Sequence, residues 1–156
     1  MHIRLIAVGD RQPSWVDAAF ENYVQRLPKQ WQFRVDVVET APRAKNSGAE
    51  AAKLAEGRKV LAKIKAPECV VVLDERGKQY SSEELSASLD NWQRDGRDLT
   101  FIIGGPDGVS KDCMQRADLR WSLSRLTLPH GLARVLFAEQ LYRAWTMSTG
   151  HPYHRS

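Results

Sequence analysis

The sequence of 156 residues contains only two cysteines, no long apolar run and no low-complexity segment. Cys69 and Cys113 lack the paired spacing of zinc ligands, so we expect neither a metal site nor a disulfide framework. A membrane span requires about 20 consecutive apolar residues, and no apolar run of this sequence approaches that length. Residues 1–6 become polar too early for a signal peptide. These absences predict a protein that works in the reducing cytoplasm, away from membranes.

A net positive charge is also missing from the first 109 residues. From Ser110 onward, seven Lys and Arg residues stand against three Asp and Glu residues, so the last third carries the whole net charge of +4. Such a local excess favours a phosphate-bearing partner. A solubilising surface would have the same composition, so the charge alone does not decide between them.

Strand and helix patterns alternate along the chain without a linker or an internal repeat. We predict strands at residues 2–9, 33–39, 69–73, 99–103 and 119–123, and helices at residues 14–27, 49–65, 81–95, 110–117 and 132–145. Ser81 and Glu84 have capping-box spacing, and Gly96 is the expected C-terminal stop of the same helix. The order predicts one α/β domain over residues 1–156, with a mainly parallel sheet and helices on both faces.

The alternation of leucines breaks phase after residue 123. Leu119, Trp121 and Leu123 alternate in one phase, whereas Leu126 and Leu128 alternate in the other. A strand cannot change its buried face without a bulge or a break. We therefore expect a turn near residues 124–125 and a shaped loop at 126–130. The final helix should bury one apolar face and leave its arginines elsewhere. That face comprises Leu132, Val135, Leu136, Leu141, Tyr142 and Trp145, and the arginines are Arg134 and Arg143.

Residues 104–108, Gly-Gly-Pro-Asp-Gly, follow a predicted strand and precede a helix. They match neither the GxGxxG nor the GxxxxGK[ST] loop of nucleotide-binding proteins. Glycines let the backbone approach a ligand closely, and loops at the carboxyl ends of parallel strands are the usual ligand position. A plain tight turn explains the residues equally well. Asp74 and Glu75 follow another predicted strand. They could act as catalytic acids or bases, or they could only cap the strand end and face solvent.

Histidines gather near the C-terminus, at His130, His151 and His154. Their spacing fits no common zinc motif. Tyr153 and Arg155 add an aromatic ring and a cation, and the set suits stacking on, and hydrogen bonding to, an extruded nucleic-acid base. A frayed tail could carry the same residues without any function.

Five segments spread over the whole chain resemble the SPOUT class of RNA methyltransferases, and within it the RlmH family. They are IRLIAVG (3–9), VVLDERGK (71–78), IIGGPDG (102–108), LSRLTLPHGLARVLFAEQLYRAW (123–145) and HPYHR (151–155). That family methylates N3 of a pseudouridine in the helix 69 loop of 23S ribosomal RNA. The resemblance implies a homodimer with a C-terminal trefoil knot that acts on assembled ribosomes, for which naked RNA fragments are poor substrates.

The resemblance also implies the methyl donor, S-adenosylmethionine, and the residues around it. We expect Tyr153, His154 and Arg155 to form the catalytic group on the RNA side and to reach across the dimer, where Tyr153 can stack and Arg155 can stabilise charge on the ring or grip a phosphate. His154 is one candidate for accepting the N3 proton, which water could also take. The donor site carried over from the family comprises Leu73, Gly104, Leu123, Ser124, Arg125, Leu126, Thr127 and Leu128, with Gly105 and His130 adjacent.

Two other functions stay open on the residues alone. A small α/β enzyme for a nucleotide or a phosphorylated metabolite would use the same glycine loop, and its activity would need no ribosome. A non-catalytic ribosome-binding factor would use only the basic C-terminal surface, and it would not bind S-adenosylmethionine.

Overall fold

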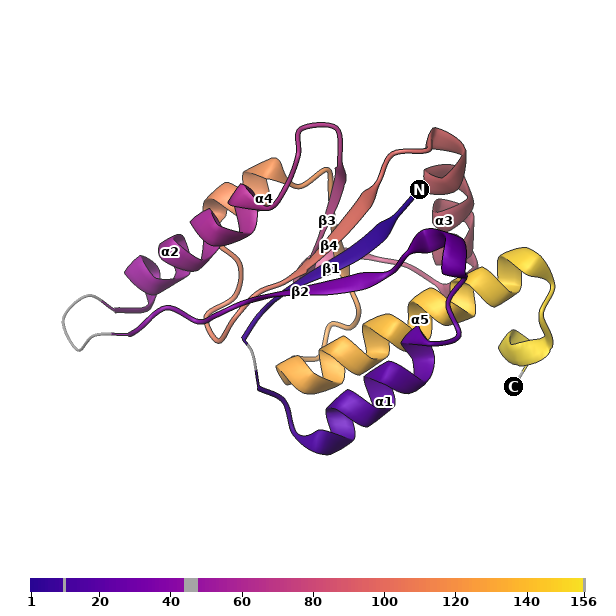
Figure 1. Cartoon of the computed structure of the whole chain (residues 1–156), viewed down its shortest axis with the longest axis horizontal. Coiled ribbons are helices and arrows are strands. Elements are labelled where there is room, and N and C mark those ends of the chain that lie inside the picture. Colours follow the sequence, from indigo (N-terminus) through magenta and orange to yellow (C-terminus); the bar gives the residue numbers. More distant parts are fainter. Residues whose placement is uncertain (10, 44–47, 156) are drawn as a thin grey trace.

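The computed structural model describes residues 1–9, 11–43 and 48–155. In this part of the chain, parallel strands form one sheet in the order β2-β1-β4-β3-β5 (Figure 1). The predicted α/β fold with a parallel sheet is thereby confirmed. The strands are β1 (Ile3–Val8), β2 (Arg34–Val38), β3 (Cys69–Gln79), β4 (Leu99–Ile103) and β5 (Leu119–Ser122).

Helices cover both faces of the sheet, as predicted. On one face α5 (His130–Thr149) packs against α1 (Ser14–Val24) and α3 (Ser82–Asp95). On the other face α2 (Gly48–Ala62) packs against α4 (Lys111–Arg116), as Figure 1 shows. Two short 3-10 helices, η1 (Lys29–Trp31) and η2 (Pro152–Arg155), complete the described elements.

Alternate residues of the central strands divide between two hydrophobic cores. Leu5 and Phe101 face the core beneath α1, α3 and α5, whereas Ile6 and Ile102 face the core beneath α2 and α4. Because both faces are covered, every residue of β4 is buried. Each core also holds one of the cysteines, and both thiols are buried and free.

The third helix begins and ends where the local sequence predicts. Ser81 accepts a hydrogen bond from the backbone N–H of Glu84, and the Glu84 carboxylate accepts one from the N–H of Ser81. Gly96 closes the helix with a φ of +77°, a left-handed conformation that glycine adopts without steric cost. Local hydrogen bonding therefore sets both ends of α3.

Strand β3 is longer than the predicted 69–73, because it continues through a bulge. Leu73 and Lys78 both pair with Trp121 of β5, so the chain between them leaves the ladder. Gly77 makes this possible, since a Cβ there would lie 2.6 Å from the backbone carbon of Arg120. The second half of β3 is mostly exposed and polar, so hydrophobicity did not reveal it.

The predicted phase break after β5 is confirmed, whereas the predicted buried face of the last helix is partly wrong. The strand ends at Ser122, and a loop over residues 123–129 leads into α5. In α5, Arg134 is buried, while Leu132 and Leu136 are exposed. The contacts with α1 and α3 select Phe137 and Leu141 as the buried residues instead of a single leucine stripe. Among the described helices, none has both the length and the apolar character required to cross a membrane.

Candidate functional site

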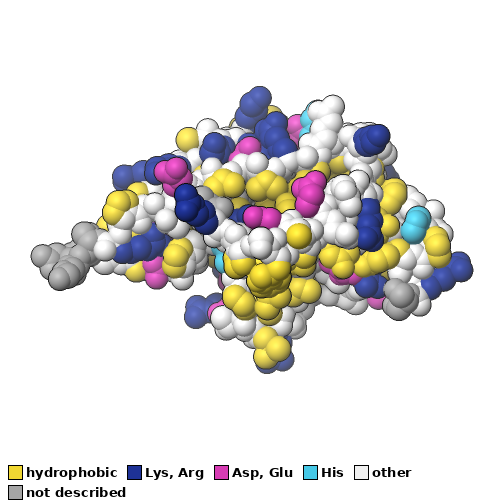
Figure 2. All heavy atoms as spheres, turned by 60° about the horizontal axis from the view of Figure 1, so that its bottom comes forward, with side chains coloured by type: hydrophobic (Ala, Val, Ile, Leu, Met, Phe, Trp, Pro, Cys, Tyr) yellow, Lys and Arg dark blue, Asp and Glu magenta, His cyan; other side chains and the backbone are white. Residues whose placement is uncertain are grey.

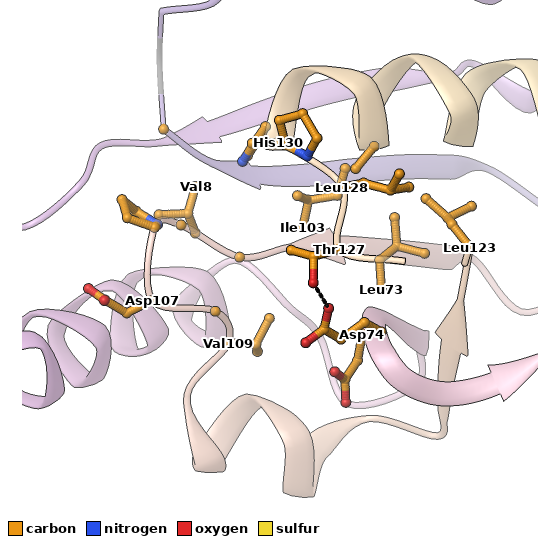
Figure 3. Close-up of a pocket in the computed structure, with 18 of the residues that line it drawn as sticks. Val8, Leu73, Asp74, Ile103, Asp107, Val109, Leu123, Thr127, Leu128 and His130 are labelled. Atoms are coloured by element: carbon orange, nitrogen blue, oxygen red, sulfur yellow. Dashed lines mark hydrogen bonds between the residues drawn. The ribbon is translucent and has the colours of Figure 1, made fainter. Parts of the chain in front are cut away.

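The carboxyl ends of β1, β4 and β5 and the bulge of β3 open onto one cavity of about 700 Å³ (Figure 3). Val8 ends β1 and Ile103 ends β4, Leu73 lies where β3 begins to bulge, and Leu123 directly follows β5. All four side chains lie around the cavity, together with Leu128 from the loop that follows β5. This is the edge at which open parallel sheets bind their ligands, and the volume suits a small organic molecule.

The glycine loop 104–108 is both a tight turn and a wall of this cavity. A Cβ on Gly104 would lie 2.6 Å from the backbone carbon of Gly108, so only glycine fits there. The N–H of Gly108 donates to the carbonyl of Gly105 over 3.0 Å, and Gly108 has a φ of +84°. The sequence left open whether residues 104–108 form a plain tight turn or a ligand-binding loop. In the structure they form a tight turn that also brings backbone atoms to the cavity surface.

An ion-pair cluster holds this glycine loop from outside. Arg43 Nη2 lies 3.0 Å from the Asp107 carboxylate, and Arg43 also donates to Glu56. Glu56 is buried and accepts the N–H of Ala41 over 2.9 Å. The hydrogen bond to Glu56 is the main cause that raises the pKa of Arg43. Arg43 therefore serves the packing of this loop. Lys45, the next basic residue in the sequence, lies outside the described residues.

A hydrogen bond within the β5–α5 loop and a second one to β3 shape the opposite wall. Ser124 Oγ accepts the N–H of Leu126 over 2.9 Å, which turns the chain where the phase break predicted a turn. Thr127 Oγ1 donates to Glu75 over 3.0 Å, the contact dashed in Figure 3. The loop is thereby fastened to the bulge of β3, and Leu126 is left 75% exposed at its tip.

His130, the first residue of α5, lies at the cavity with Arg134 behind it. Their side chains meet over 3.1 Å, from His130 Nε2 to Arg134 Nη2. Burial lowers the pKa of His130, and the charge of Arg134 lowers it further, against an opposing hydrogen bond with the Gly104 backbone. Arg134 also donates to the carbonyl of Gly9 over 3.3 Å. The imidazole at the cavity wall is therefore neutral near pH 7.

Eight residues were predicted from the sequence to bind the methyl donor, and the structure brings seven of them together around the cavity. Arg125 is not among the lining residues, although both of its neighbours are. Gly105 and His130, predicted to be adjacent, line the cavity as well. The seven are Leu73, Gly104, Leu123, Ser124, Leu126, Thr127 and Leu128.

The three residues predicted for the substrate side do not line this cavity. Tyr153, His154 and Arg155 form η2, which packs against the C-terminal end of α5. The cavity lies at the start of that helix, whereas the Tyr153 hydroxyl reaches Glu139 near its middle, about 13 Å along the helix axis from His130. Within one chain, the terminal group and the cavity therefore lie apart, and Figure 1 shows the C-terminal segment near the last turns of α5, away from the start of this helix.

Sequence reasoning missed the polar residues that hold the terminal group. The Tyr153 hydroxyl donates to Glu139 over 3.1 Å, and the Arg143 guanidinium lies 5.2 Å from the Tyr153 ring centroid. The pair Glu139 and Arg143 was visible as an (i, i+4) spacing. His154 Nδ1 is buried without a hydrogen-bond partner in the described part of the chain. No group of three or more His, Cys, Asp or Glu placed to hold a metal occurs among the described residues.

Comparisons with known proteins point to one family. The family model described as "Predicted SPOUT methyltransferase" matches residues 1–154. The chain is 48% identical to the ribosomal RNA large subunit methyltransferase H of Chromohalobacter salexigens, over 99% of this chain and 100% of that protein. It is also 48% identical to the enzyme of the same name from Thioalkalivibrio sulfidiphilus, over 99% of each chain.

Two solved structures share the fold at low sequence identity. A probable methyltransferase from Bordetella pertussis has a TM-score of 0.55 and 16% identity, covering 92% of this chain and 95% of that one. A probable methylase family protein from Haemophilus influenzae has a TM-score of 0.56 and 11% identity, covering 97% of this chain and 69% of that one. At these identities the likeness concerns the fold alone.

Proposed function

The chain belongs to the SPOUT methyltransferase family, and on that premise we propose that it methylates N3 of a pseudouridine in the helix 69 loop of 23S ribosomal RNA. The observation that carries the proposal is the full-length similarity to ribosomal RNA large subunit methyltransferases. Family membership also implies the C-terminal trefoil knot, and we take residues 1–156 as one functional domain. A ribosomal RNA substrate places the protein in the cytoplasm.

The cavity at the strand ends fits S-adenosylmethionine. Its volume of about 700 Å³ is within the usual range for small-molecule sites. Apolar side chains from three strand ends and the β5–α5 loop can enclose an adenine ring, and the backbone of the glycine loop offers polar atoms. When bound, S-adenosylmethionine supplies a methyl group already activated by its sulfonium. The residues that would hold it are Leu73, Gly104, Leu123, Ser124, Leu126, Thr127 and Leu128, with Arg125 between them in the loop.

The remaining work of the protein is to orient the pseudouridine ring and to manage the proton on N3. Tyr153 offers a ring for stacking, and Arg155 is exposed and can stabilise negative charge on the ring or grip a phosphate. His154 is the candidate for accepting the N3 proton, and water is the alternative. No metal enters this proposal.

A homodimer would reconcile the cavity with the distant terminal group. Since the cavity lies at the start of α5 and the terminal group packs along its second half, a second copy packed with its α5 antiparallel would bring Tyr153, His154 and Arg155 toward the partner's cavity. Hydrophobic side chains gather on the face formed by α1 and α5, as Figure 2 shows. Trp15, Leu132 and Leu136 are 56%, 41% and 37% exposed, which supplies apolar surface for such an interface.

The described residues form one sheet covered by helices, so we infer that the RNA is recognised by the dimer surface and by the shape of the target. We therefore propose that the substrate is the assembled ribosome. The basic last third of the chain would contact RNA phosphates. An isolated stem-loop carrying the same pseudouridine should be a poor substrate.

Methyl transfer from labelled S-adenosylmethionine to three substrates tests the proposal. The substrates are intact ribosomes that lack the modification, isolated large subunits and deproteinised RNA. Label on large-subunit RNA only from intact ribosomes is the expected result. Saturable donor binding without label would mean a different methyl acceptor. Absence of donor binding would favour the metabolite enzyme or the non-catalytic ribosome-binding factor.

A further inference from the structure

A buried arginine beside the cavity has a geometry that core packing does not explain. Arg134 is only 5% exposed, and its Nε is buried without a hydrogen-bond partner in the described part of the chain. No ion pair among the described residues includes it. Burial is the main cause that lowers the pKa of Arg134, and the charge of Asp17 on α1 opposes it. A buried cation without a close carboxylate is costly.

The contacts of this guanidinium lead to the cavity. Arg134 Nη2 lies 3.1 Å from His130 Nε2 and 3.3 Å from the carbonyl of Gly9. A guanidinium can only donate, so His130 Nε2 must accept and the ring proton must be on Nδ1. On the other side, the backbone of Gly104 hydrogen-bonds the same imidazole. The neutral ring thus bridges Arg134 and Gly104.

The backbone groups of Gly9 and Gly104, which contact Arg134 and His130 respectively, belong to neighbouring strand ends. Gly9 follows β1 and Gly104 follows β4, and these strands pair directly. Both glycines and His130 line the cavity. The start of α5 also packs closely on α1, because a Cβ on Gly131 would lie 2.9 Å from Val16. One guanidinium therefore links the start of α5 to both strand ends that form the cavity wall.

We propose that Arg134 is a positioning residue for the donor site: through His130 and the Gly9 carbonyl, it fixes the backbone at the ends of β1 and β4. It does not touch the donor. The proposal rests on the proposed function in taking this cavity as the donor site. It assigns the buried charge to shaping a ligand wall instead of stabilising the fold.

Substitution by methionine separates these two roles. An apolar side chain of similar length removes a buried charge at little cost in stability. We expect Arg134→Met to keep the wild-type melting temperature and to bind S-adenosylhomocysteine about tenfold more weakly, the size of one charge-assisted hydrogen bond. Arg134→Lys, which keeps one donor, should recover part of the affinity. Calorimetric titration measures the dissociation constants, and wild-type affinity in Arg134→Met overturns the proposal.

A second buried arginine provides the matched control. Arg4 is 7% exposed, but it forms ion pairs with Asp36 and Glu68, each over 3.0 Å, at the opposite edge of the sheet. Arg4→Met should lower the melting temperature and leave the dissociation constant unchanged. If Arg134→Met behaves like Arg4→Met, Arg134 is a structural residue and the proposal is wrong.

A double-mutant cycle tests the link through His130. If both residues act as one unit, Arg134→Met and His130→Ala together should weaken binding no more than about the worse single variant. Additive losses overturn the link. Nitrogen chemical shifts of the free protein give a readout that needs no methyl donor: His130 should carry its proton on Nδ1, and Arg134→Met should shift the Nε2 resonance because that nitrogen loses its hydrogen bond. A proton on Nε2 in the wild type overturns the proposal even if the donor itself is misassigned.

Discussion

The Tyr153 hydroxyl donates a hydrogen bond to Glu139 Oε1 over 3.1 Å, and the same oxygen accepts from Arg143 Nε over 2.9 Å. The terminal segment is therefore anchored on α5 of its own chain. Burial, together with Tyr23 and Glu139, raises the pKa of Tyr153 well above its ordinary value, so the phenol stays neutral across the physiological range. This geometry presents an aromatic ring in a defined place.

The first prediction concerns stacking by Tyr153. If the ring stacks on the target base, Tyr153→Phe should keep most of the activity, whereas Tyr153→Ala should lose about tenfold or more, the usual effect of removing one stacking platform. Single-turnover rates on unmodified ribosomes at saturating donor measure both variants. Equal losses in the two variants would show that the hydroxyl matters instead of the ring.

The second prediction concerns the proton on N3. If His154 accepts it, His154→Ala should lower the single-turnover rate by about a hundredfold, within the usual contribution of a general base. Binding of S-adenosylhomocysteine should change little, because His154 is assigned to the RNA base and does not line the cavity of its own chain. A near-normal single-turnover rate would dismiss His154 as the proton acceptor and leave that step to water.

The third prediction tests whether each site is shared between two chains. A variant with the tail changes His154→Ala and Arg155→Ala is mixed and refolded with the cavity variant Gly104→Val. Each alone should be nearly inactive. In a homodimer with shared sites, the mixture should regain about a quarter of wild-type activity, because half of the dimers are mixed and each has one intact site. A mixture as inactive as its components would place each site within one chain.

The fourth prediction compares two crowded glycines. A Cβ on Gly104 would meet the Gly108 backbone at 2.6 Å, whereas a Cβ on Gly57 would meet the Ser110 side chain at 2.2 Å. Both Gly104→Ala and Gly57→Ala should lose about 1–3 kcal/mol of stability through overpacking. Only Gly104→Ala should also weaken donor binding, since Gly57 does not line the cavity. Denaturant unfolding and calorimetric titration check the two effects, and weakened binding in Gly57→Ala would contradict the assignment.

The fifth prediction concerns acid sensitivity. Burial is the main cause that lowers the pKa of His130 below its ordinary 6.5, and Arg134 adds to it. Near and below pH 6.5, the unfolded chain therefore binds a proton that the folded chain resists, so stability must fall as the pH falls. Wild-type protein should lose stability faster than His130→Gln between about pH 7 and pH 5, the range in which histidine titrates. Urea unfolding at several pH values measures the slopes, and equal slopes would contradict the assignment.

Much of the fold followed from local sequence rules. Ser81 and Gly96 mark the limits of α3 because their hydrogen bonds are local, and the apolar runs of β1 and β4 reflect burial on both faces. The change of alternation between Leu123 and Leu126 predicted the loop after β5, because alternation along a strand is also a local pattern. These features depend on residues close in sequence.

The parts that sequence reasoning missed depend on contacts between distant segments. Arg134 was expected away from the buried face of the final helix, yet it is buried and donates to the Gly9 carbonyl from the other end of the chain. The attachment of Arg43 to Asp107 joins residues 64 positions apart, and no local pattern announces it. The separation of the cavity from Tyr153 became visible only with the course of α5.

Analysis of the modified nucleoside tests the central claim most directly. Unmodified ribosomes are incubated with the protein and labelled S-adenosylmethionine, and the 23S RNA is then digested to nucleosides and separated with mass detection. The account predicts that the label appears in 3-methylpseudouridine from the helix 69 loop and that Gly104→Val abolishes it. Label in another nucleoside, or no label although the donor binds, would contradict the account.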